Sequence, residues 1–167
     1  GFAHPDGKFR FAPKWAQVLP HGFDTNSLTS KMPALPDHWP VIEDATAEMP
    51  YRLVTAPARS YLNSTFSETP SSIAREGKPT VMIHPDDAAD LGVVDDDIVK
   101  LGNNRGVVPI AVEIFDGLQR GVVVVESIWP NAAFEGGKGI NALTGADPVA
   151  PVGGAAFHDN RIWIKPV

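Results

Sequence analysis

The chain has 167 residues, of which 43% are hydrophobic and 20% charged, a composition ordinary for a globular protein. This length suits one domain, because compact domains mostly have about 100–200 residues. The absence of cysteine excludes disulfides, zinc knuckles, iron–sulfur ligation and thiol nucleophiles from this chain. The net charge of −6 and the scattered Lys and Arg argue against a nucleic-acid or anionic-membrane partner. No apolar run approaches the about 20 residues of a membrane helix.

Residues 1–50 differ from the rest of the chain. Prolines at positions 5, 13, 20, 33, 36, 40 and 50 interrupt polar clusters, and only Lys8–Phe11 alternates as a strand would. This pattern predicts an irregular, Pro-rich lead-in or wrapping arm over 1–50. Because the chain begins at Gly1 rather than Met, we also expect it to be a piece of a longer protein.

From Tyr51 onward the pattern is rich in β-branched runs bounded by Gly, Pro, Asn and Asp, which is typical of strands. The expected strands are 51–55, 80–83, 98–101, 107–114, 121–126 and 161–165. Their short and irregular spacing disfavours βαβ winding. It favours a small closed barrel of about six or seven strands.

A short helix is predicted between His84 and Gly92. Pro85 suits its first position, acidic residues follow in the first turn, and Gly92 suits a left-handed stop. We interpret His84 as the helix cap. Residues 71–76 are expected to form a second helical turn, and Asp95–Asp97 a tight turn before the next strand.

No catalytic or metal-binding set emerges from the sequence. The histidines at 4, 21, 38, 84 and 158 show no i, i+4 pair, which disfavours a zinc site. The aspartates between 86 and 97 lack the spacing of an EF-hand loop, so capping and turn formation is the favoured interpretation. The Gly-x-Ser-x-Gly pattern of a hydrolase is also absent. We therefore assign no catalytic residue.

The stretch HPDDAADLGVVDDDIVKLGNNRGVVPIAVEI, followed by an apolar strand and Trp129-Pro130-Asn131, resembles the C-terminal domain of the molybdopterin oxidoreductase family. Members of that family carry an Asn/His-Pro-x-Asp-Ala helix, an Asp-Gly-Asp turn and a strand pair joined by an Arg-Gly turn. Asp96 stands where the family usually has glycine. The opening GFAHPDGKFRFAP and the tail from Gly139 are also similar to family segments, so the resemblance covers about 1–13 and 51–167.

The resemblance implies a mainly β fold over 51–167, a double-psi β-barrel (aspartate decarboxylase-like) with one or two short helices. It further implies a cofactor, bis(molybdopterin guanine dinucleotide) with molybdenum or tungsten, held jointly with upstream domains of the same enzyme. Those domains would supply the metal ligand and any iron–sulfur cluster, so this domain alone is expected to be inactive. We expect a cytoplasmic location, with a periplasmic one as the alternative.

The implied cofactor-binding residues lie in loops. The loop after the first strand offers a forked guanidinium and several hydroxyl, amide and backbone donors. The Trp-Pro-Asn turn and the Asn-x-Leu-Thr loop would lie beside the pterin or the guanine, although Trp129 equally suits a core position. The predicted residues are Arg59, Ser60, Asn63, Ser64, Thr65, Trp129, Asn131, Asn141, Thr144 and Asp147.

Two alternatives belong to other classes. A stand-alone double-psi barrel that binds a protein or peptide would expose an apolar patch, whereas a cofactor domain needs polar loops on one rim. A self-processing decarboxylase would need a Gly-Ser cleavage pair, which the sequence lacks.

Overall fold

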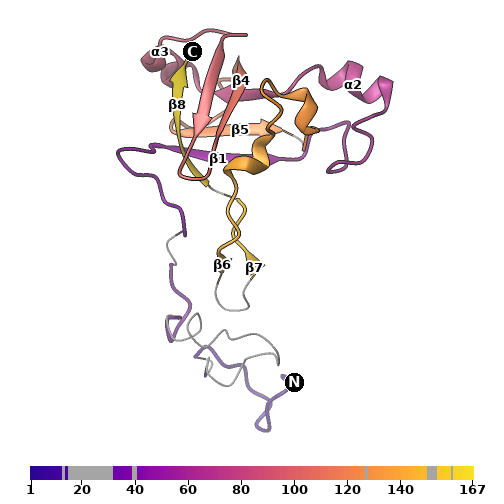
Figure 1. The fold of residues 1–167 in the computed structure, drawn as a ribbon. Helices are drawn as coiled ribbons and strands as arrows, with labels where there is room; N and C mark the ends of the chain where they lie inside the picture. The colour runs from indigo at the N-terminus through magenta and orange to yellow at the C-terminus, as the bar shows by residue number, and fades with distance from the viewer. Residues whose placement is uncertain (13, 15–31, 39–40, 127, 150–153, 159) are drawn as a thin grey trace. The chain divides into compact units, whose positions relative to one another are not determined.

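The computed structural model describes residues 1–12, 14, 32–38, 41–126, 128–149, 154–158 and 160–167 (Figure 1). The chain divides into two compact units. The first comprises Gly1–Ile42 with Ala146–Ala156, and the second comprises Glu43–Gly145 with Phe157–Val167. None of the described helices is long and apolar enough to cross a membrane.

The second unit contains a closed barrel in the strand order β1-β5-β2-β4-β3-β8. Two strand pairs, β1–β5 and β2–β4, are parallel, and the other neighbours are antiparallel. This closed, mainly β architecture confirms the predicted double-psi barrel class. The strands are β1 (Tyr51–Ala56), β2 (Thr80–Ile83), β3 (Ile98–Gly102), β4 (Val107–Ile114), β5 (Val122–Glu126) and β8 (Asn160–Pro166).

The barrel interior is filled by alternate residues of its strands. In β3, for example, Val99 and Leu101 are fully buried while Ile98 and Lys100 are exposed. This alternation places apolar side chains from all six strands in one core. Gly102 is required at the end of β3, because a Cβ there would lie 2.1 Å from Cζ2 of Trp163.

The two predicted helices are present. In α3 (Pro85–Leu91), His84 Nδ1 accepts from the backbone N–H of Asp86 at 3.1 Å, and Gly92 at φ 69° ends the helix. The capping role predicted for His84 is thereby confirmed. The second helix, α2 (Pro70–Glu76), also begins at a proline, and it lies at one side of the barrel (Figure 1).

The aspartates before β3 form a turn, as predicted. Asp96 adopts φ 68°, the left-handed conformation that suits the glycine usual at this position in the family that the sequence resembles. Asp97 Oδ2 accepts from Val94 N–H at 2.8 Å, and Asp95 Oδ1 accepts from Ile114 N–H at 2.6 Å. Across the described ranges, no group of three or more His, Asp or Glu could hold a metal ion.

The first unit holds little regular structure in its described part. Lys8–Phe11 forms no strand, although its residues alternate in polarity. Instead the rings of Phe2, Phe9 and Phe11 pack edge to face, with centroids 5.3 and 4.8 Å apart. A short ladder of β6 (Pro148–Val149) and β7 (Gly154–Ala155) was not predicted. Positions 13, 15–31, 39 and 40 of the predicted arm lie outside the described residues.

A buried carboxylate joins α3 to the start of β5. Asp87 is 5% exposed; its Oδ1 accepts from Arg120 Nε at 3.0 Å and its Oδ2 from Gly121 N–H at 2.6 Å. Arg120 also pairs with the exposed Asp90. The burial of Asp87 is therefore compensated by one ion pair and one backbone donor.

A buried carboxamide at the start of β8 fixes the loop that precedes β6. Asn160 is fully buried; its Oδ1 accepts from Gly145 N–H at 3.0 Å and from Arg105 Nη2 at 3.1 Å. Its Nδ2 donates to the Phe157 carbonyl at 3.0 Å.

Arg105 also donates to the Leu143 carbonyl at 3.0 Å and forms an ion pair with Glu43 at 2.7 Å. The 3-10 helix η3 (Ile140–Leu143) is thus tied to the β3–β4 turn.

The Asp87 linkage predicts a contrast between two carboxylates that share one arginine. Asp87→Ala should lower the free energy of unfolding by about 1–3 kcal/mol, because the Gly121 N–H loses its acceptor. Asp90→Ala, which removes an exposed partner of Arg120, should cost less than about 1 kcal/mol. Urea unfolding of both variants measures the difference, and equal losses would contradict the assigned role of Asp87.

Asn160→Ala should destabilise the chain by about 1–3 kcal/mol and speed hydrogen exchange of the Gly145 amide. Asn104→Ala is the matched control, because Asn104 is exposed and its side chain forms no hydrogen bond with the described part of the chain. It should change stability by less than about 0.5 kcal/mol. Unchanged exchange at Gly145 in the Asn160 variant would refute the linkage.

Candidate functional site

A hollow of about 340 Å³ opens at the end of β1, between segments that are distant in the sequence. Three residues predicted as cofactor ligands, Asn63, Asn141 and Thr144, meet there. Its lining comprises Thr55, Ala56, Pro57, Asn63, Ile128, Ile140, Asn141, Thr144, Phe157 and His158. We call it the amide hollow.

Local structure holds the amide side chains at this rim. Asn63 has φ 53° in a turn closed by two backbone hydrogen bonds between Leu62 and Thr65, of 3.1 and 2.8 Å. Asn141 lies in η3, and Thr144 Oγ1 donates to its carbonyl at 3.1 Å. Within the described ranges, neither the Asn63 nor the Asn141 carboxamide has a hydrogen-bond partner. Both are therefore available to a ligand.

His158 and Phe157 also line the amide hollow, although neither was predicted as a site residue. His158 Nδ1 lies 3.3 Å from Thr55 Oγ1, and its ring is 4.4 Å from that of Phe157 at an interplanar angle of 47°. The pairing of β8 with β1 is the signal that could have identified these two residues. Because β8 runs antiparallel to β1, residues just before β8 lie at the same rim as residues just after β1.

The chemistry of the amide hollow suits a flat heterocycle. Ile128, Ile140 and Phe157 provide apolar wall, while two carboxamides, two threonines and an imidazole provide donors and acceptors. Its volume lies in the range of small-molecule sites, about 300–1,000 Å³. No Lys, Arg, Asp or Glu is among the lining residues. The hollow therefore offers hydrogen-bond donors and acceptors, and His158 is the one titratable side chain in its lining.

Arg59 and Ser60 line a different hollow, of about 590 Å³, together with Ser72, Arg75 and Glu76. We call it the arginine hollow. It shares no lining residue with the amide hollow. The backbone N–H of Ser60 donates to Glu76 Oε1 at 2.6 Å, which joins the β1 loop to the end of α2.

The remaining predicted residues occupy other surroundings. Trp129 is 8% exposed and packs in the core, where it meets Tyr61 edge to face at 5.1 Å and donates from Nε1 to the Glu126 carbonyl at 3.2 Å. Asn131 Oδ1 accepts from Gly139 N–H at 3.0 Å, within its own loop. Ser64 and Thr65 are exposed in the turn that carries Asn63, and Asp147 lies in the first unit. Their contact with a cofactor stays a prediction.

Two groups near the rim, the buried Tyr61 and the half-buried Glu126, have perturbed acidity. Burial, and then the charge of Glu76, raises the pKa of the Tyr61 phenol, whose buried hydroxyl has no hydrogen-bond partner among the described atoms. Burial raises the pKa of the Glu126 carboxyl at the end of β5, and Glu76 and Glu113 raise it further. Deprotonation of both groups is therefore disfavoured.

Comparison with known proteins places this barrel in a family. Residues 51–161 match the family described as "Molydopterin dinucleotide binding domain". A "Probable oxidoreductase YoaE" of Bacillus subtilis (strain 168) is 36% identical over 138 residues, which cover 81% of this chain and 19% of that protein. A "Respiratory nitrate reductase subunit alpha" of Haloferax mediterranei is 26% identical over 110 residues, which cover 65% of this chain and 11% of the relative.

Among solved structures, "Acetylene Hydratase from Pelobacter acetylenicus" aligns with a TM-score of 0.66 at 15% identity, covering 80% of this chain and 21% of that one. At this identity the likeness concerns the fold alone. The chain spans about a fifth or less of the length of these relatives. The family match covers most of the chain and includes β1 to β5 together with the first residues of β8. The chain therefore belongs to the molybdopterin dinucleotide binding domain family.

Proposed function

We propose that the amide hollow binds one end of a molybdopterin guanine dinucleotide, and that the barrel helps to close the cofactor site of a molybdenum or tungsten oxidoreductase. One observation carries the proposal. Two unpaired carboxamides, Asn63 and Asn141, converge on a hollow with apolar walls inside the family-matched segment. Guanine and pterin rings both present amide edges that such side chains recognise.

The chain's own residues would bind and orient this group. Asn63 and Asn141 would hydrogen-bond the edges of a ring, and Phe157 with His158 would pack against its face. Arg59 and Ser60 would meet phosphate oxygens, whereas Ser64 and Thr65 would offer hydroxyl or backbone donors. Trp129 and Asn131 would act by holding the rim, and Asp147 would accept from guanine nitrogens.

The other parts of the reaction centre would come from elsewhere in the parent protein. We propose upstream domains that supply the metal ligand and an iron–sulfur cluster, with the cofactor held between them and this barrel. The bound metal would supply the redox chemistry, while residues of this chain exclude water from the cofactor. Two matched relatives bear the names "Biotin sulfoxide reductase" and "Dimethyl sulfoxide/trimethylamine N-oxide reductase", and those names describe their own substrates.

We further propose that 51–167 forms the cofactor domain and that 1–50 is an arm that wraps against the parent enzyme. A cytoplasmic location is proposed for the parent, without nucleic-acid or membrane contact by this domain. The alternative of a stand-alone protein-binding module is not favoured, because the family match and the polar rim both support a cofactor ligand.

The proposal predicts that isolated ligand fragments bind the amide hollow. Guanosine and 6-hydroxymethylpterin, titrated separately into the chain, should shift the side-chain amide resonances of Asn63 and Asn141. Asn141→Ala should weaken binding of the preferred fragment by about tenfold, since a lost hydrogen bond costs about 1.4 kcal/mol at the upper end of the neutral range.

Asn104→Ala serves again as the control, because it removes a carboxamide outside the hollow. It should leave fragment affinity unchanged. Equal affinity in wild type and both asparagine variants, or shifts confined to residues outside the hollow, would reject the amide hollow as the site.

A further inference from the structure

The outer face of β8 and its two neighbouring strands carries four basic side chains. Arg161, Trp163 and Lys165 point outward from β8, because they alternate with buried residues. Arg52 of β1 lies directly across from Arg161, and Lys100 of β3 lies directly across from Lys165. The structure describes every residue of these three strands, and they contain no other charged side chain. The face is therefore basic in a chain whose net charge is −6.

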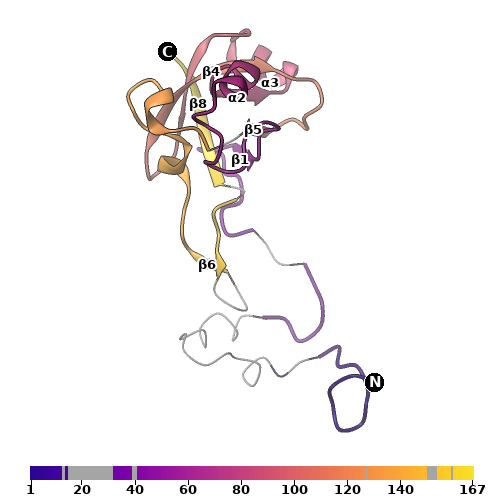
Figure 2. The same cartoon turned by 90° about the vertical axis from the view of Figure 1, so that its right-hand side faces the viewer.

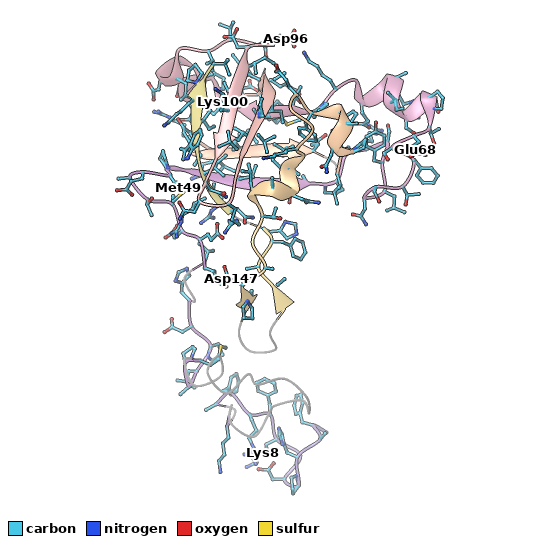
Figure 3. All side chains as sticks on the ribbon, viewed as in Figure 1. Lys8, Met49, Glu68, Asp96, Lys100 and Asp147 are labelled. Carbon is cyan, nitrogen blue, oxygen red and sulfur yellow. The ribbon has the colours of Figure 1, made fainter. Side chains whose placement is uncertain are left out.

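Both cross-strand pairs join like charges, which is unfavourable when the side chains lie directly opposite one another. The arginine pair has a counter-charge: Asp44 Oδ1 lies 3.6 Å from Arg52 Nη2, and the Asp44 carbonyl accepts from Arg161 Nη1 at 3.3 Å. The lysine pair differs, because neither Lys100 nor Lys165 forms an ion pair with any residue that the structure describes. Both lysines are exposed, and Lys100 is labelled in Figure 3. One end of the face is therefore neutralised by the chain itself, and the other end is not.

A partly exposed aromatic ring adjoins the lysine pair. Trp163 lies across from Gly102, and its ring occupies the space that a side chain at Gly102 would fill. Lys165 Nζ is 4.8 Å from the centroid of this ring, which is a cation–π contact. Tryptophan is enriched among the residues that anchor protein interfaces. The two ammonium groups therefore stand beside a flat apolar surface that the strand pairing holds in place.

We propose that Lys100, Trp163 and Lys165, which we call the lysine face, dock an acidic segment of a separate protein. Carboxylates of that segment would pair with the two ammonium groups, and one of its side chains would pack on the indole. The chain's own Glu43-Asp44 segment is a precedent, since Asp44 brings a carboxylate and a carbonyl to the basic pair at the other end of β8.

The charge of the lysine face favours a transient partner. Lysine is depleted in the cores of stable interfaces, whereas exposed charges steer the encounter of partners that associate and separate. The scattered distribution of the other basic residues argues against a nucleic acid or an anionic membrane as the occupant. No residue of the lysine face lines either hollow, so this inference does not rest on the proposed cofactor.

The first test titrates a blocked hexaglutamate peptide into the chain and follows the indole N–H resonance of Trp163, which Trp163→Phe identifies. Lys100→Gln should weaken binding by about threefold and Lys100→Gln/Lys165→Gln by about tenfold, because each exposed ion pair contributes modestly. Lys138→Gln removes an equal charge from an exposed position outside these strands and should have no effect. Hexaglutamine, which lacks the carboxylates, should not bind.

Lys100→Glu separates docking from a role in folding. The substitution places opposite charges directly across β3 and β8, so it should raise the melting temperature by about 1–4 °C. The same substitution should abolish hexaglutamate binding, because a carboxylate then faces the peptide. A lower melting temperature would mean that the lysine pair supports the fold, and this result would contradict the proposal.

Other outcomes would overturn the occupant. Hexaglutamate affinity that is equal in wild type and Lys100→Gln/Lys165→Gln, or no binding at millimolar peptide, would remove the lysine face as a docking site. Tighter binding of a single-stranded oligonucleotide or of phosphatidylglycerol vesicles, lost in the same double variant, would overturn the choice of a protein partner.

Lysine acetylation in the full-length parent protein tests whether the partner is separate. Mass spectrometry should find that Lys100 and Lys165 react as fast in the parent as in the 167-residue chain. Lys138 supplies the reference rate within each sample. Protection of the two lysines in the parent would show that another part of the same protein covers the lysine face, which would overturn the assignment to a separate protein.

Discussion

Closure of the barrel between β1 and β8 is the constraint on which the rest of the structure depends. Leu53 at the centre of β1 pairs with Val123 of β5 on one side and with Asn160 of β8 on the other, so β1 has no open edge (Figure 2). The antiparallel direction of β8 brings the residues before it to the rim where β1 and β5 end. One strand pairing therefore decides which loops can meet in a site.

Asn160 adds a polar anchor at this closure. It is fully buried, yet its carboxamide binds groups of three separate segments, at Gly145, Arg105 and Phe157. A buried amide is costly unless its donors and acceptors are paired, so the segments must adopt the arrangement that pairs them. The same contacts hold η3 on one side of the amide hollow and Phe157 on another. The stability of the barrel and the geometry of the rim thus depend on the same side chain.

Local signals were enough to predict the strands and helices. The β-branched runs, Pro85, Gly92 and the acidic turn each restrict the backbone conformation of only a few neighbouring residues, so they can be interpreted without the tertiary fold. The rim was only partly predictable. Asn63, Asn141 and Thr144 came from loop motifs. His158 lines the amide hollow because β8 pairs with β1, and Arg75 lines the arginine hollow because α2 folds back against the β1 loop. Adjacency in the sequence does not decide which hollow a residue of the 57–65 loop lines. The left-handed turn at Asn63 reverses the chain, and Arg59 lines a different hollow.

The separation of the two hollows has a physical rationale in the chemistry of the proposed ligand. An aromatic ring is recognised best by uncharged donors, acceptors and apolar walls, which exclude water without requiring a counter-ion. Phosphates need cationic forks, and these would repel one another and draw in solvent if placed beside the ring. The loop from Pro57 to Asn63 lets a single strand end contribute to both, with Asn63 lining the amide hollow and Arg59 lining the arginine hollow. In such an arrangement the amide hollow determines which ring is accepted. Arg59, in a chain of net charge −6, would supply the local attraction for an anion that most of the surface repels.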